Sequence, residues 1–262
     1  MTKKTGIILS DTHCGSEVGL TPPEFQYSPS SSCNQAKFAQ LQAESWGWYK
    51  KATDSIGKVD YLFCLGDLID GQNLKNAGVG QITTSIEKQC KMAIQCVQQV
   101  KAKKIEIVQG TGYHVTTQGI EAERLIAESV GANFGIHTFV DVNGFVFNLK
   151  HKTSRSIIPH GRMTGPSRAK LWEVIWKETK GFPTSNLLVR GHVHYYQYYC
   201  SSMGAVMTMP CLKTLGDRYG ASNYDDTIDY GFIYFEIDKD GSFSHKWYTP
   251  HFKREIPRVR KI

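Results

Sequence analysis

The sequence predicts an α/β fold in which stacked β-sheets carry helices on their outer sides. In the first half of the chain, short aliphatic runs alternate with segments of helical periodicity. The second half consists mostly of strand patterns separated by turn signals. A length of 262 residues suits one large domain or two small ones, and it is long enough for a sizeable core. A βαβα order followed by further strands favours layers of sheet packed between helices.

Three aliphatic runs in the first half are predicted to be buried parallel strands. They cover residues 5–10, 59–65 and 104–108, and Gly or Asp bounds each of them on its C-terminal side. Aliphatic runs without polar alternation are typical of strands that are covered on both faces.

Four segments show the apolar spacing of helices, at residues 38–56, 86–100, 120–130 and 166–180. The second opens with Thr84-Ser85-Ile86-Glu87, which predicts a capping box. Gly131 and Gly181 follow the third and fourth segments, where glycine commonly ends a helix.

The second half predicts strands at residues 134–140, 145–150, 187–190, 195–200, 205–209, 231–237 and 243–248. Val142-Asn143-Gly144 predicts a hairpin turn between the first two of them.

Composition excludes several classes of protein. With 40% hydrophobic and 21% charged residues, the chain is not disordered, collagen-like or a coiled coil. Its apolar runs are all far shorter than the ~20 residues that span a bilayer, and no signal-peptide core is present, so we expect no membrane partner and a cytoplasmic location. Seven scattered cysteines without a CxxC pair are typical of reduced thiols.

The net charge of +7 hints at a polyanionic partner such as nucleic acid. Residues 251–262, however, contain five Lys or Arg and one Glu, a net +4, which leaves only +3 for the rest of the chain. We therefore expect one domain over residues 1–250 and a basic C-terminal tail over residues 251–262. The charge is at most a minor argument for nucleic acid.

Polar side chains gather where the predicted strands end, which is where open α/β sheets bind ligands. The residues are Asp11 and His13, Asp67 and Asp70, His114, His151, and His192 and His194. Each alone is weak, but together they place five of the nine histidines at successive strand ends. Imidazole and carboxylate ligands without thiolates suit Mn, Fe, Zn or Ni, and the set is too large for one tetrahedral ion. An extended strand end would point Asp11 and His13 the same way, and likewise His192 and His194.

This ordered set resembles the calcineurin-like metallophosphoesterase superfamily. The matching motifs are Asp11-x-His13, Gly66-Asp67-x-x-Asp70, a glycine-led loop ending at His114, an isolated His151, and Gly191-His192-x-His194. The resemblance implies a four-layer α/β/β/α sandwich of two mixed sheets. It also implies one metal site at Asp11, His13 and His194, another at His151 and His192, and Asp67 as the bridge between them. By the same resemblance His114 is catalytic beside the leaving group, and Asp70 orients it.

One motif departs from the family pattern. The family usually has Gly-Asn-His in the third motif, whereas this chain has Gly110-Thr111-Gly112-Tyr113-His114. Either Thr111 takes the place of the Asn ligand or that ligand is missing. This variant, the Cys14-Gly15-Ser16 continuation and the long loop at residues 21–33 make the chain similar to calcineurin-like proteins encoded by phages.

The function expected from this resemblance is hydrolysis of phosphate esters by direct attack of a metal-bridging hydroxide. Two divalent ions are implied, Mn first, with Fe, Zn or Ni as alternatives. Arg162 lies in a basic segment after His151 and is the first choice for a phosphate contact. The substrate is a phosphomonoester or a phosphodiester, including nucleic acid. A catalytically silent binding scaffold on the same fold and a nucleic-acid-binding protein with a structural metal site are the alternatives, and the oligomeric state is left open.

Overall fold

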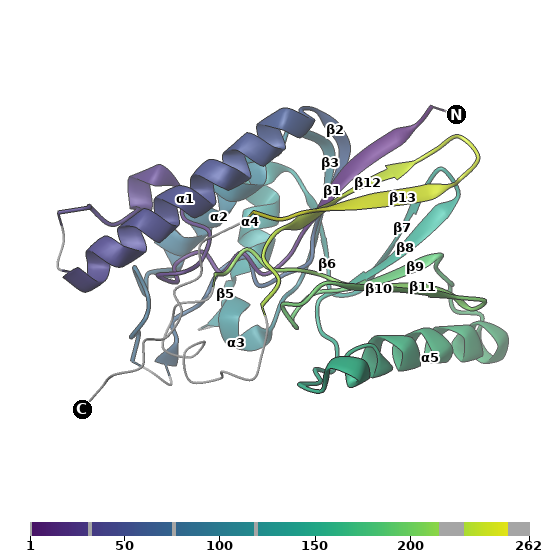
Figure 1. Cartoon of the computed structure of the whole chain (residues 1–262). Coiled ribbons are helices and arrows are strands. Elements are labelled where there is room, and N and C mark those ends of the chain that lie inside the picture. The colour runs from purple at the N-terminus through teal and green to yellow at the C-terminus, as the bar shows by residue number, and fades with distance from the viewer. Residues whose placement is uncertain (1, 31–32, 75–76, 118–119, 215–227, 251–262) are drawn as a thin grey trace, which may run out of the picture.

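The computed structural model describes residues 2–30, 33–74, 77–117, 120–214 and 228–250. Two mixed sheets stack face to face, and helices cover their outer sides (Figure 1). The predicted four-layer sandwich is therefore confirmed. The predicted basic tail, residues 251–262, lies outside the described residues.

The first sheet has six strands in the order β13-β12-β1-β2-β3-β6. Their bounds are β13 Phe243–Tyr248, β12 Phe232–Ile237, β1 Lys4–Leu9, β2 Val59–Cys64, β3 Ala102–Val108 and β6 Asn133–Gly135. β1, β2, β3 and β6 run parallel, so the prediction of parallel strands in the first half is confirmed. β12 and β13 extend the sheet with antiparallel pairs.

The second sheet has five strands in the order β10-β11-β9-β8-β7. Their bounds are β10 Gln197–Ser201, β11 Gly204–Thr208, β9 Leu187–Arg190, β8 Phe145–Lys150 and β7 Thr138–Val142. The predicted strand at residues 134–140 is wrong as one element. Its first residues belong to β6 in the first sheet and its last to β7 in the second, so the chain crosses between the sheets at residues 136–137. The hairpin turn after β7 is confirmed by its antiparallel pairing with β8.

Helices lie on both outer faces of the sandwich. α1 (Cys33–Ile56), α2 (Ile86–Gln99) and α4 (Ala122–Val130) cover the six-stranded sheet, and α5 (Thr164–Lys180) covers the five-stranded one (Figure 1). The short elements are α3 (Gly112–Val115), the 3-10 turns Pro23–Phe25 and Pro159–Gly161, and a hairpin of β4 (Thr116–Thr117) and β5 (Ile120–Glu121).

Three helix starts and one helix cap differ from the predictions. α1 begins at Cys33, before the predicted residue 38, and α5 at Thr164, before the predicted residue 166. α4 begins at Ala122, because the two residues before it pair in β5. α2 is capped by Ser85, whose side chain accepts a hydrogen bond from the main-chain N of Lys88, so the cap lies one residue later than the predicted capping box. Gly131 and Gly181 end α4 and α5 with left-handed backbone, as predicted.

Alternate residues of the central strands face two separate cores. Ile7 and Leu9 pack under the helices of the six-stranded sheet, whereas Ile8 between them faces the other sheet. Phe63 and Phe147 meet edge to face in the core between the sheets, with ring centroids 5.3 Å apart. This packing joins the two sheets face to face.

The layer beneath α5 is polar. Lys170 and Glu173 are buried, and the Lys170 ammonium lies 2.6 Å from a Glu173 carboxylate oxygen. Glu173 also accepts hydrogen bonds from Asn148 and Ser185.

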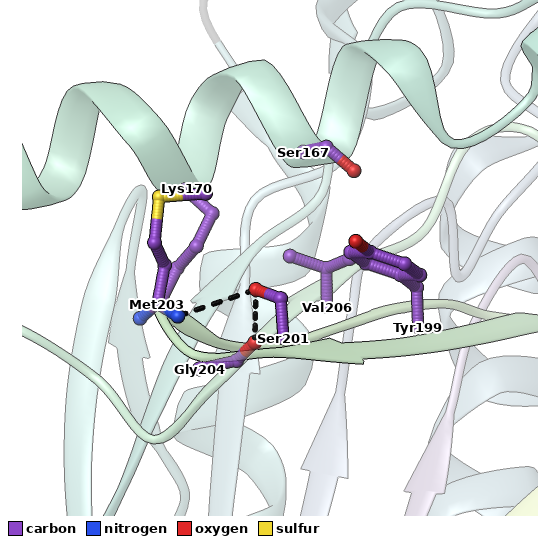
Figure 2. Close-up of a pocket in the computed structure, with 7 residues that line it drawn as sticks. All are labelled: Ser167, Lys170, Tyr199, Ser201, Met203, Gly204 and Val206. Carbon is purple, nitrogen blue, oxygen red and sulfur yellow. Dashed lines mark hydrogen bonds between the residues drawn. The ribbon is translucent and has the colours of Figure 1, made fainter.

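A small pocket lies between α5 and the β10–β11 hairpin (Figure 2). It is lined by Ser167, Lys170, Tyr199, Ser201, Met203, Gly204 and Val206. None of these residues belongs to the predicted metal site, so the pocket is separate from it.

The described cysteines are free thiols, as predicted. Cys14 and Cys96 lie closest, with their sulfur atoms 3.6 Å apart in the core.

Within the described part of the chain, every helix is too short or too polar to cross a bilayer.

Candidate metal centre

The predicted site residues converge where the strands of both sheets end. Loops after β1, β2 and β3 come from the first sheet, and loops after β8 and β9 come from the second. The close approach is clearest at Gly191, after β9, where a Cβ atom would overlap Ser10 after β1 and crowd His151 after β8. The absence of a side chain at Gly191 leaves room for the Ser10 hydroxyl and the His151 ring.

Five of the candidate ligands have left-handed backbone. Their φ angles are 53° at Asp11, 44° at His13, 50° at Asp67, 72° at His192 and 58° at His194. Such angles are uncommon outside glycine and gather at functional sites, where the surrounding fold holds the strain. The expectation of extended strand ends is therefore wrong: tight turns aim these side chains. His192 and His194 also enter different clusters rather than pointing the same way.

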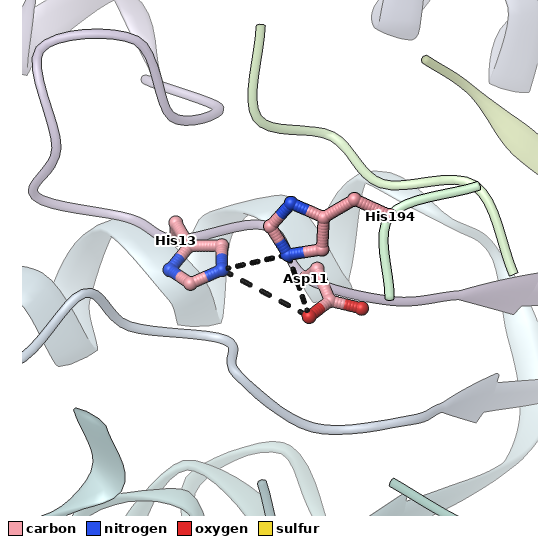
Figure 3. A group of neighbouring side chains, drawn as sticks. All are labelled: Asp11, His13 and His194. Carbon is pink, nitrogen blue, oxygen red and sulfur yellow. Dashed lines mark hydrogen bonds and ion pairs between the residues drawn. The ribbon is translucent and has the colours of Figure 1, made fainter. Parts of the chain in front are cut away.

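The first cluster contains Asp11, His13 and His194 (Figure 3). The Nε2 atom of His194 lies 3.1 Å from Oδ1 of Asp11 and 3.3 Å from Nε2 of His13. The third side of the triangle, from Nε2 of His13 to Oδ1 of Asp11, is 3.8 Å. Asp11 is fully buried and His13 nearly so. Three ligand atoms thus face one another at a spacing that fits a single ion.

The second cluster contains Asp67, His151 and His192. Nε2 of His151 lies 3.0 Å from Oδ2 of Asp67. The hydroxyl oxygen of Thr111 lies 3.2 Å from Nε2 of His151 and 3.2 Å from Nδ1 of His192. The main-chain N of Thr111 donates to Oδ1 of Asp67 over 2.6 Å. Thr111 therefore lies beside this cluster. The sequence had left open whether Thr111 takes the position of the Asn ligand in the third motif.

The two clusters touch. The main-chain N of His192, in the second, donates to Oδ2 of Asp11, in the first, over 3.1 Å. Ser10 donates to the same Asp11 oxygen. The charges of Asp11 and His13, as well as that of His151, affect the pKa of the Asp67 carboxyl.

Asp70 and His114 meet in a way that the sequence did not indicate. Nδ1 of His114 lies 2.7 Å from the main-chain oxygen of Asp70, so the backbone and not the carboxylate holds this ring. The Asp70 carboxylate instead accepts from Nδ1 of His13 over 3.0 Å. The rings of His13 and His114 meet edge to face, with centroids 4.8 Å apart. His13, Asp70 and His114 form a third group that could hold a metal ion.

Arg162 lies beside the residue that follows His194. Its guanidinium carbon is 4.5 Å from the centroid of the Tyr195 ring, and the Tyr195 hydroxyl donates to the main-chain oxygen of Arg162. Arg162 is 9% exposed, so it is held against the protein rather than solvated.

Strong mutual interactions set the protonation of these groups. Burial opposes ionisation of Asp11, Asp67 and Asp70, but neighbouring imidazoles outweigh it and keep the pKa of each carboxyl below its usual value. Burial, with the charge of Lys213, lowers the pKa of His13 to about 4. Burial also acts against the charged form of His151, yet the carboxylates of Asp11 and Asp67 raise its pKa to about 9.

Sequence reasoning missed several residues that support the site. Lys213 lies 3.3 Å from the Asp70 carboxylate, and Gln81 donates to its other oxygen over 3.0 Å. Glu123 and Gln89 reach the ligand loops from α4 and α2. Their only sequence signal is a polar residue on the buried face of an amphipathic helix, and that signal does not say what the residue contacts.

Comparison with solved structures finds similar chains at low sequence identity. Vacuolar Protein Sorting 29 from Cryptosporidium parvum is 11% identical, with a TM-score of 0.48 over 95% of this chain and 100% of that chain. A novel archaeal phosphodiesterase is 12% identical, with a TM-score of 0.44 over 93% and 99% of the two chains. A predicted phosphoesterase from Streptococcus pneumoniae is 11% identical, with a TM-score of 0.40 over 95% and 99%. No protein-family model matches the chain, and no curated protein matches it. Function is therefore argued from the side chains of the site.

Proposed function

We propose that this chain is a dinuclear metal-dependent hydrolase of phosphate esters and a member of the calcineurin-like metallophosphoesterase superfamily. The observation that carries the proposal is the pair of touching Asp and His clusters, aimed by left-handed turns at the carboxyl ends of both sheets. Metal sites that activate water for phosphoryl chemistry are commonly built from such pairs of clusters.

The outer contacts of the histidines support metal binding. A metal-binding imidazole usually donates its second ring N–H to a carboxylate or a carbonyl, which fixes the ligand nitrogen. Nδ1 of His13 lies on the Asp70 carboxylate and Nδ1 of His151 on the main-chain oxygen of Leu65, at 3.0 and 2.5 Å. Each ring thus presents Nε2 to its cluster. The donor set therefore fits divalent ions, with Mn preferred and Fe, Zn or Ni as alternatives.

We assign the first ion to Asp11, His13 and His194, and the second to His151, His192 and Thr111, with Asp67 shared between them. Bound there, two ions would supply Lewis acidity to the phosphate and an activated water. Five of these ligands lie in left-handed turns after the strands, and the side chains are already grouped in two clusters.

We propose that His114 handles the proton of the leaving group. A carbonyl oxygen only accepts, so Nδ1 of His114 carries the proton that lies on the Asp70 main chain. Its Nε2 atom is then the one that gives up or takes a proton at the leaving oxygen. We propose two roles for Asp70. Its main-chain oxygen orients His114, and its carboxylate orients His13. Arg162 is proposed to contact the phosphate.

Hydrolysis of model esters tests the proposal. The purified chain with added Mn²⁺ is expected to hydrolyse bis-p-nitrophenyl phosphate, p-nitrophenyl phosphate or both, and the ratio of the two rates separates diester from monoester preference. Asp67→Asn should abolish turnover, whereas Asp54→Asn, an exposed carboxylate on α1, should not change it. Full activity of Asp67→Asn would contradict the assignment of Asp67 to the metal site. If the wild type hydrolysed neither these esters nor nucleic acid, the proposal would fail and a catalytically silent scaffold would be favoured.

A further inference from the structure

We propose that Glu123 is a positioning residue that fixes the geometry of the second metal cluster, an inference that rests on the proposed function. Glu123 lies in the first turn of α4, on the buried face of that helix. It is 1% exposed and forms no part of the ligand clusters themselves. Its carboxylate instead contacts the main chain of the two loops that carry Asp67 and Thr111.

Each carboxylate oxygen of Glu123 holds one loop. Oε1 accepts from the main-chain N of Leu68 over 3.0 Å, and Leu68 directly follows Asp67. Oε2 accepts from the main-chain N of Gly110 over 2.6 Å, and Gly110 directly precedes Thr111. One rigid carboxylate therefore sets the distance between a loop after β2 and a loop after β3.

The two loops are in contact where Glu123 joins them. A Cβ atom at Gly110 would overlap the main-chain N and a carboxylate oxygen of Asp67. Beside this contact, the main-chain N of Thr111 donates to Oδ1 of Asp67, and Oδ2 of Asp67 faces His151. A shift of either loop would thus turn the Asp67 carboxylate away from the second cluster.

The chemical choice of glutamate supports a role beyond packing. Fully buried carboxyl groups are rare because burial disfavours the charged form. Burial, with the nearby charge of Asp67, raises the pKa of Glu123 to about 8. Here each oxygen takes one main-chain N–H, and a glutamine would set its NH2 group, which only donates, against one of these two donors. Divalent ions bound beside Asp67 would favour the carboxylate form of Glu123, in which both oxygens accept hydrogen bonds.

The same loop after β2 is held further along, at Gly71, in a related way. Gln89 of α2 is fully buried, and its side-chain amide contacts both the main-chain N and the main-chain O of Gly71, over 2.8 Å each. Gly71 directly follows Asp70. Side chains from two helices on the outer face of the six-stranded sheet thus anchor the one loop that carries Asp67 and Asp70.

The test compares Glu123→Gln with Glu128→Gln, a change of the same chemistry at an exposed position of the same helix. The first readout is Mn²⁺ titration by calorimetry of metal-stripped protein. Glu123→Gln is expected to weaken the second ion about 10–100-fold and to leave the first within about twofold, because supporting contacts of this kind change metal affinity by that factor. With saturating Mn²⁺ its kcat should recover, and Glu128→Gln should behave as wild type in every readout.

A second readout separates this inference from the proposed function. In metal-free protein, amide hydrogen exchange at Leu68 and Gly110 should be faster in Glu123→Gln than in Glu128→Gln. If wild type binds fewer than two ions, the proposed function fails. If wild type binds two ions and Glu123→Gln binds the second as tightly, or loses both ions equally, the positioning role is overturned. Should Glu123→Gln not fold, Glu123→Asp replaces it, with the same selective loss of the second ion expected.

Discussion

Replacing Thr111 by Val isolates the unusual ligand position of this chain. Valine keeps the β-branched shape and the main-chain N–H that donates to Asp67, and it removes only the hydroxyl. That hydroxyl lies 3.2 Å from each of two imidazole nitrogens, on His151 and His192. We expect the change to weaken the second metal ion selectively.

The size of the effect follows from one lost polar contact in a charged site. Such a contact contributes about 1.5–3 kcal/mol. Because about 1.4 kcal/mol is tenfold in Kd, the second Mn²⁺ should bind about 10–100-fold more weakly. The first ion, held by Asp11, His13 and His194, should be unaffected.

Calorimetric titration of metal-stripped protein with Mn²⁺ measures both ions. Thr179→Val is the matched control, since it removes an exposed hydroxyl that bonds only to its own helix, α5. Thr111→Asn should bind the second ion at least as tightly as wild type, because an amide carbonyl is a better ligand than a hydroxyl. Unchanged second-ion affinity in Thr111→Val would refute the assignment of Thr111 to the metal site.

Three further changes test the chemistry, the electrostatics and the core. His114→Ala should lower kcat about 10²–10⁴-fold while two Mn²⁺ remain bound, and retained turnover in a steady-state assay would remove His114 from catalysis. In metal-free protein, His151 has a pKa of about 9, above its unfolded value of 6.5, so the stability that it contributes is fully present below pH 6.5 and is lost as the pH rises to 9. In urea unfolding, the free energy of unfolding should fall by up to about 3 kcal/mol over this range. The same fall in a His151→Asn variant would contradict its assignment to the titration of His151. Phe147→Ala, at a fully buried position between the sheets, should lower the free energy of unfolding by about 3–5 kcal/mol, and a cost below about 1 kcal/mol would mean that the core repacks.

Local sequence patterns predict most of the fold. The strand at residues 59–65 and the helix at residues 166–180 are recovered within a few residues, because periodicity and glycine stops are local properties. The predicted strand at residues 134–140 is wrong because the chain changes sheets within an apolar segment. Which sheet a residue joins depends on its pairing partner, and single-strand patterns carry no such information.

The members of the site were easier to predict than their contacts. Asp and His at strand ends identify the two clusters, since strand ends of stacked sheets meet. The left-handed turns at Asp11 and His13 were not predictable, because nothing in the local sequence demands them. The carboxylate of Asp70 on His13, and the reach of Glu123 to two loops, depend on helices and strands far apart in the chain. The likeness to phage-encoded proteins and the cytoplasmic location stay predictions.

A crystal of the protein grown with Mn²⁺, with anomalous scattering measured at the manganese edge, tests the central claim most directly. The account predicts two anomalous peaks in each molecule. One should lie among Asp11, His13 and His194, the other among His151, His192 and Thr111, with Asp67 contacting both. A single peak, or two peaks of which neither contacts Asp67, would contradict a dinuclear site.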